Sequence, residues 1–138
     1  MQTLTVSAPP AQLTPTVASQ RDPICDEWET TTRSYTSQQD PWTRSDPNVP
    51  GSHWNPQQRA AATATAPVIR DEAANLRELA SRTKSPCLRV LLRAQAVYED
   101  AFADRLPSYQ PPCDAGLWQA ALTFRASAAA VCTAIIPG

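Results

Sequence analysis

Apolar residues recur every three or four positions in four separate stretches of the chain, a spacing typical of amphipathic α-helices. Helix-start signals open the stretches: Asp, Asn or Ser followed by Pro in three cases, and an Asp in the fourth. The predicted helices cover residues 22–39, 55–83, 85–107 and 114 onward. No stretch shows the alternation of β-branched residues that is typical of strands. We therefore predict an all-α domain with a four-helix bundle-like fold.

Proline shapes the connections between these predicted helices. Residues 40–55 contain three prolines and a glycine, which predicts a long irregular crossover. Pro67 lies inside the second helix, where its missing N–H is expected to kink the helix or divide it in two. Residues 1–21 are rich in Thr, Pro, Ala, Ser and Gln, so we expect a disordered or extended linker or stalk ahead of a domain at 22–138. An ordered arm on the domain is the alternative.

Composition makes the core of this domain thin and points to covalent support. The chain has 138 residues and a hydrophobic fraction of 42%, and much of that fraction is alanine, which buries little area. Cys25, Cys87, Cys113 and Cys132 contain no C-x-x-C pair, which argues against zinc and redox sites. We predict two structural disulfides and an extracytoplasmic location; four buried free thiols are the alternative.

Helix geometry limits how the cysteines can pair. Cys113 and Cys132 would lie about 28 Å apart along a continuous helix, whereas the Cα atoms of bonded cysteines are about 4.4–6.8 Å apart. Two pairings remain: Cys25–Cys113 with Cys87–Cys132, or Cys25–Cys132 with Cys87–Cys113. The first is preferred, because antiparallel third and fourth helices bring Cys87 to Cys132. It also requires the crossover to make the first two helices parallel.

Charge and hydropathy exclude two classes of partner. The formal net charge is −1, which argues against a nucleic-acid partner. No run of 18 or more apolar residues is present, so we expect no membrane insertion by this segment itself. Because an extracytoplasmic domain needs export, we expect a signal peptide or membrane anchor upstream of Met1.

We find no catalytic, cofactor-binding or metal-binding motif, and we expect no cofactor. His53 is the only histidine in the sequence, and it has no recognisable nucleophile or base beside it. Clustered carboxylates on the predicted helices are interpreted as solvated faces. One enzymatic alternative is a small secreted helical enzyme similar to chorismate mutases, although the single lysine weakens it. Its polar residues would come from Arg70, Arg77, Arg89, Arg93, Gln95 and Glu99.

Aromatic residues outside the predicted helices give the best indication of binding. Trp42 and Trp54 lie in the predicted crossover, with His53 beside Trp54, and Tyr109 lies in a second proline-rich loop. These rings either cap a thin core or, with His53, form a binding surface for a peptide, lipid or glycan. The second reading favours a sensor or protein/ligand-interaction domain. A secreted carrier of an apolar ligand is a further alternative.

Three stretches resemble uncharacterised extracytoplasmic helical domains of mycobacterial and related actinobacterial membrane-anchored proteins. They are CDEW at Cys25–Trp28, WNP together with APVIRDEA at Ala66–Ala73, and ALTF…CTAI near the C-terminus. The resemblance covers Cys25–Ile135. Some such domains belong to receptor-type Ser/Thr kinases or lipoproteins. The resemblance therefore implies a tethered, non-catalytic sensor or interaction domain with a ligand or protein partner in the cell envelope.

Overall fold

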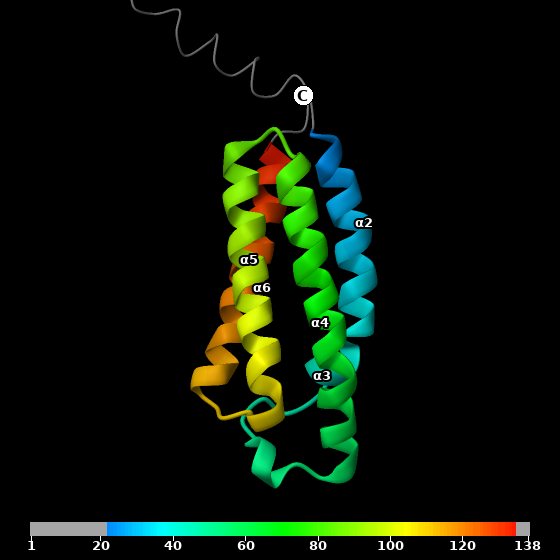
Figure 1. The fold of residues 1–138 in the computed structure, drawn as a ribbon, viewed down its shortest axis with the longest axis vertical. Coiled ribbons are helices and arrows are strands. Elements are labelled where there is room, and N and C mark those ends of the chain that lie inside the picture. The colour runs from blue at the N-terminus through cyan, green and yellow to red at the C-terminus, as the bar shows by residue number, and fades with distance from the viewer. Residues whose placement is uncertain (1–21, 135–138) are drawn as a thin grey trace, which may run out of the picture.

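The computed structural model describes residues 22–134, and every regular element within this range is helical. Four long helices form the fold (Figure 1): α2 (Pro23–Gln38), α4 (Pro56–Arg82), α5 (Pro86–Arg105) and α6 (Cys113–Ala134). The connections contain the short helices α3 (Asp40–Thr43), η2 (Gly51–His53) and η3 (Leu106–Ser108). The all-α prediction is confirmed. The predicted linker at residues 1–21 lies outside the described residues.

Local capping explains why the helices begin where the sequence predicts. The side chain of Asp22 caps α2 and that of Ser85 caps α5, each by accepting a backbone N–H of the first turn. Asn55 and Gln58 form a reciprocal capping box at the start of α4. All three helices carry proline in the first turn, where the missing donor costs nothing. These starts are thus fixed by residues adjacent in sequence.

Helix α4 runs through Pro67 as one element. The alternative that Pro67 divides it into two helices is therefore wrong. The proline ring removes the hydrogen bond to the carbonyl of Thr63, but both residues are exposed, so water can satisfy that carbonyl. α4 consequently presents one continuous buried face from Ala62 to Ala80, on both sides of the proline.

Consecutive long helices run in opposite directions. The hydroxyl of Thr83, just past the end of α4, donates to the carboxylate of Asp22 at the start of α2, so these helices are antiparallel (Figure 1). The predicted parallel arrangement is wrong, because residues 39–55 stay at one end of the bundle instead of running its length. There the N–H of Gly51 donates to the carbonyl of Tyr109 at 2.9 Å. A Cβ at Gly51 would lie only 3.3 Å from the Tyr109 nitrogen, so glycine suits this close approach.

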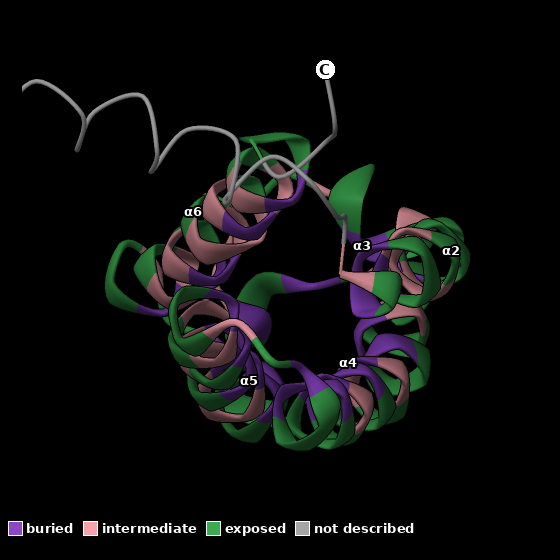
Figure 2. Cartoon of the chain, turned by 90° about the horizontal axis from the view of Figure 1, so that it is seen from above, coloured by how far each residue is buried: buried purple, intermediate pink, exposed green. Residues whose placement is uncertain are grey.

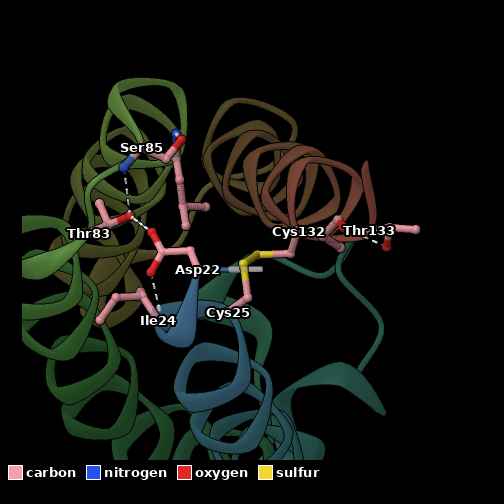
Figure 3. Close-up of a disulfide and its surroundings, with 9 residues drawn as sticks. Asp22, Ile24, Cys25, Thr83, Ser85, Cys132 and Thr133 are labelled. Atoms are coloured by element: carbon pink, nitrogen blue, oxygen red, sulfur yellow. Dashed lines mark hydrogen bonds between the residues drawn. A yellow bond between two sulfur atoms is a disulfide. The ribbon is translucent and has the colours of Figure 1, made fainter. Parts of the chain in front are cut away.

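One disulfide, Cys25–Cys132, joins the start of α2 to the end of α6 with a Cα–Cα distance of 5.6 Å (Figure 3). It belongs to the less preferred of the two predicted pairings; the preferred Cys25–Cys113 with Cys87–Cys132 is wrong. The second predicted disulfide is also absent, since Cys87 and Cys113 are free and exposed. These two residues begin antiparallel neighbours, α5 and α6, and so lie at opposite ends of the bundle, about 30 Å apart along α5.

Seen from above, α2, α4, α5 and α6 form an arc whose buried residues face inward (Figure 2). The buried apolar side chains fall into two clusters. The cluster at the disulfide end consists of Ile24, Cys25, Trp28, Ala73, Leu76, Leu79, Ala80, Leu88, Leu92, Ala96, Ala128 and Cys132. The cluster at the loop end consists of Trp42, Trp54, Ala62, Ile69, Phe102, Ala103, Leu106, Tyr109 and Trp118. None of the described helices combines the length and hydropathy of a membrane span.

Candidate functional site

A group of buried polar side chains separates the two apolar clusters. Glu72 in α4, Glu99 in α5 and Arg125 in α6 each fall between residues of one cluster and residues of the other, and Gln39 directly follows α2. Gln95 lies one turn before Glu99 in α5. We call this group the polar layer; it comprises Gln39, Glu72, Gln95, Glu99 and Arg125. Gln39, Glu72, Gln95 and Glu99 are at most 1% exposed. Charged groups this deep in a protein are rarely tolerated without partners, so their contacts matter.

Arg125 connects the polar layer across three helices. Its Nη2 atom donates to Glu72 Oε1 at 3.2 Å and to Gln39 Oε1 at 3.3 Å. The same atom lies 3.7 Å from Glu99 Oε2. Gln39 in turn donates to Glu72 at 2.7 Å, and Gln95 donates to Glu99 at 2.7 Å. One guanidinium of α6 is therefore shared between carboxyl groups of α4 and α5 and the end of α2.

Two carboxyl groups facing one cation leave an excess negative charge if both are ionised. Burial, and then repulsion by Glu72, raise the pKa of Glu99 to about 9, against the opposing effects of Gln95 and Arg125. Glu99 is therefore protonated at neutral pH, and the polar layer is close to electrically neutral. Neutralisation is the expected response of a carboxyl group that burial has removed from water.

We predict that stability falls as pH rises because of Glu99. Its folded pKa of about 9 lies above the ordinary value of 4.5, so between these values the folded state keeps a proton that the unfolded state has lost. The stabilisation is complete below pH 4.5 and is lost as pH approaches 9, by up to about 1.4 kcal/mol per pH unit. Urea unfolding between pH 5 and 9 measures the slope. Glu99→Gln should flatten it, and Asp71→Asn, at an exposed position, should not.

Several polar atoms of this layer have no hydrogen-bond partner. They include Gln95 Oε1, Glu99 Oε1 and Arg125 Nε. The Arg125 side chain is 17% exposed and is the only polar-layer residue with appreciable access to solvent. Among residues 22–134 no group of three or more His, Cys, Asp or Glu side chains is placed to hold a metal ion. The arrangement is thus suited to fixing how the helices pair, a known use of buried polar groups.

The structure separates the residues of the chorismate-mutase-like alternative. Gln95 and Glu99 lie in the polar layer, but Arg70 pairs with Asp104 at 2.7 Å and Arg77 with Asp100 at 2.6 Å, both on the surface. Arg89 donates to backbone carbonyls at the α4–α5 turn, and Arg93 is exposed. The predicted arginines therefore do not converge with Gln95 and Glu99.

Sequence reasoning missed Arg125 and interpreted Glu72 and Glu99 as parts of solvated helix faces. That interpretation is wrong, because both carboxyl side chains are at most 1% exposed, and a signal for the burial of Arg125 and Glu72 was present. Arg125 lies in the same helical stripe as Ala121, Ala128 and Cys132, all of which are buried. A charged residue within a predicted core stripe indicates a buried partner of opposite charge. Glu72 occupies the equivalent place in α4, next to Ala73.

Three of the four residues predicted to form a binding surface lie together inside the loop-end cluster. The Trp54 and Tyr109 rings stack with centroids 5.7 Å apart, and Trp42 meets Tyr109 edge-on at 5.1 Å. Trp42 is 4% exposed and Tyr109 is 1% exposed. His53 is exposed beside them. These positions match the alternative that the rings cap a thin core; their role in ligand binding stays a prediction.

A small pocket opens beside these rings. Its volume is about 150 Å³, and it is mostly apolar. Arg59 lies at its edge, over the Trp54 ring at 5.9 Å, and donates to the carbonyl of Gly51. The lining residues are Trp54, Arg59, Ala62, Thr63, Ala66, Leu106 and Pro107. Pockets for drug-sized ligands are larger, about 300–1,000 Å³, so this hollow suits only a small apolar group.

The outward face of α5 carries an exposed apolar stripe. Val90 is 65% exposed and Val97 is 57% exposed, and they are the large hydrophobic residues most open to solvent in the described chain. The residues on this side of the helix are spaced alternately by three and four positions. We call them the α5 stripe; they are Cys87, Val90, Ala94, Val97 and Ala101.

A family described as "Mycobacterial ESX-1 associated protein" matches residues 3–136, nearly the whole chain. The chain belongs to this family. An uncharacterised protein of Mycolicibacterium smegmatis strain MKD8 is 29% identical over 118 residues, which cover 85% of this chain and 31% of that protein. The chain therefore spans about a third of this curated relative's length. No solved structure matches the chain.

Membership of the mycobacterial ESX-1 associated family bears on the resemblance noted from the sequence. The mycobacterial affiliation of this helical domain is confirmed. The finer assignments, to the sensor domain of a receptor kinase or to a lipoprotein, stay predictions.

Proposed function

We propose that this chain is a non-catalytic, extracytoplasmic protein-interaction module that serves the mycobacterial ESX-1 secretion system. The observation that carries the proposal is the α5 stripe, in which Val90 is 65% exposed and Val97 is 57% exposed. A chain with a thin, alanine-rich core gains nothing by leaving large apolar side chains in water. Contiguous exposed apolar residues on a rigid helix commonly mark an interface.

Two further observations support the proposal. The family match names an ESX-1 association, which gives the proposed interaction a cellular setting in a secretion system. The buried Cys25–Cys132 disulfide is suited to an oxidising location such as the cell envelope or the exterior. Tethering of the chain to the membrane by an upstream segment stays a prediction.

The two alternatives from the sequence have less support. A helical enzyme needs its polar groups accessible to substrate, but Glu72 and Glu99 are at most 1% exposed. A carrier of an apolar ligand needs a large internal cavity, and the pocket beside Trp54, at about 150 Å³, is too small for that role. A protein-interaction role requires neither of these features, only a presented surface.

We predict that photo-crosslinking from the α5 stripe will identify the interface in cells. A photoreactive phenylalanine analogue at position 97, in the chain expressed in a mycobacterium with an active ESX-1 system, should give adducts of a defined mass. The matched control is the same analogue at Ser34, an exposed position on α2, which should give none. The absence of adducts from position 97, or equal adducts from both positions, would contradict the proposed interaction role.

A further inference from the structure

We propose that the α5 stripe packs antiparallel against the α5 stripe of a second copy of this chain, forming a symmetric dimer. The proposal rests on the proposed interaction function and names the partner of the same surface. The twofold axis crosses α5 between Ala94 and Val97. Three properties of the helix carry this inference: its spacing, the sizes of the stripe residues and the charges that flank them.

The spacing of the stripe is that of a helix–helix seam. Cys87, Ala94 and Ala101 repeat every seven residues, and Val90 and Val97 follow the first two of them by three positions. This alternation of three and four keeps a stripe on one side of a helix that packs along another helix. The opposite side of α5 contributes Leu88, Leu92 and Phe102 to the core, so the stripe points away from its own bundle. Figure 2 shows exposed residues on the outer side of the helix arc.

The sizes of the stripe residues favour the antiparallel orientation. In an antiparallel pair centred between positions 94 and 97, Val97 faces the partner's Ala94 and Val90 faces the partner's Ala101. Each layer then combines one branched side chain with one methyl group, which lets the helices approach closely and fill the space between them. A parallel pair would instead set alanine against alanine in alternate layers and leave gaps.

The flanking residues also fit the antiparallel orientation. Arg93 borders the stripe on one side and comes near the partner's Asp100. Because the dimer is symmetric, this attraction occurs twice in it. On the other side, half-buried Leu91 and Tyr98 lie near the partner's Tyr98 and Leu91. In a parallel pair the partner's Asp104 would face Asp104, and like charges in a seam are unfavourable. Asp100 already accepts from Arg77 at 2.6 Å, and its carboxylate has room for a second donor.

The contact is modest in size. A single pair of facing helices falls in the class of interfaces below about 1,200 Å². We therefore expect a dimer with a dissociation constant in the micromolar range. Sedimentation velocity over a series of concentrations should show monomer converting to dimer, and Val97→Asp should keep the protein monomeric. Ala74→Asp, an exposed position on α4, is the matched control and should dimerise like the wild type.

Disulfide trapping tests the orientation. The antiparallel seam places Cys87 opposite position 104 of the partner, whereas a parallel seam places it opposite the partner's Cys87. In a Cys113→Ser background, oxidised glutathione should convert the D104C variant into a covalent dimer. The same protein that retains Asp104 should stay a non-covalent species. In this exchange two protein thiols become one disulfide, and the glutathione disulfide is reduced to two glutathione thiols. Positions 87 and 104 are about 25 Å apart on one helix, so they cannot bridge within a chain.

Three results would overturn the antiparallel dimer. They are a monomer at hundreds of micromolar, covalent dimers of the Cys113→Ser protein without D104C, and failure of D104C to link in a protein that keeps its helical circular dichroism. The consequences for the proposed function differ. If position 97 crosslinks in cells to a protein of another mass while the purified chain stays monomeric, the interaction role stands and the dimer falls. An adduct of twice the chain's mass supports both.

Discussion

Reducing the Cys25–Cys132 disulfide is expected to lower the free energy of unfolding by about 4–5 kcal/mol. The two cysteines are separated by 107 residues in sequence, so the bond removes much of the conformational freedom of the unfolded chain. For a loop of this length the chain-entropy relation gives a stabilisation close to the upper end of the usual range, about 5 kcal/mol. The bond also joins the two ends of the helix arc, α2 and α6, at the end shown in Figure 3.

Thermal unfolding with and without dithiothreitol measures this effect directly. We expect the reductant to lower the Tm of the wild-type protein by about 10–20 °C. Cys25→Ala with Cys132→Ala should unfold near the temperature of the reduced protein and should not respond to the reductant. Cys87→Ser with Cys113→Ser, which changes the exposed cysteines, should behave like the wild type in both conditions. An unchanged Tm on reduction would contradict the structural role of the bond.

Local features explain why the sequence predicted the helices well. Asp22, Asn55 and Ser85 each cap the helix that follows by bonding within one turn, so a few adjacent residues determine each start. Pro67 shows the limit of such local reasoning. It predicts a break when considered alone, but the buried face of α4 on both sides of it holds the helix together.

The chain's topology and cysteine pairing depended on contacts that no local pattern encodes. Whether α2 and α4 run parallel or antiparallel is decided by where residues 39–55 pack. The backbone hydrogen bond between Gly51 and Tyr109, which are far apart in sequence, keeps residues 39–55 at one end of the bundle. Once the helices alternate in direction, Cys87 and Cys113 cannot meet. The same loop contacts explain why Trp42 and Tyr109 are buried, since helical periodicity says nothing about side chains in irregular segments.

From the composition we predicted two disulfides to support a thin core, whereas the structure has one. Aromatic residues from the loops supply apolar area that the alanine-rich helices lack, and they do so at the end of the bundle remote from the disulfide. The disulfide serves the other end. The polar layer lies between the two clusters and adds no apolar area. We therefore infer that it acts by selecting which helices pair with one another. Arg125 offers the most direct test.

Replacing Arg125 with methionine is expected to lower the free energy of unfolding by about 3–5 kcal/mol. Methionine retains most of the volume and length of the arginine side chain, so the change isolates the charge and its hydrogen bonds. Without the guanidinium, the Glu72 carboxylate stays 1% exposed and is hydrogen-bonded only by neutral groups, Gln39 and protonated Glu99. Urea unfolding at pH 7 measures the loss. Arg33→Met, at an exposed position on α2, should change stability by less than about 0.5 kcal/mol.

A second substitution separates charge from packing. If the loss in Arg125→Met comes from an uncompensated carboxylate, then adding Glu72→Gln should recover a large part of it, because the polar layer again carries no excess charge. If Glu72→Gln adds its own loss to that of Arg125→Met, Arg125 stabilises the bundle through packing, and the polar layer does not select the pairing of the helices.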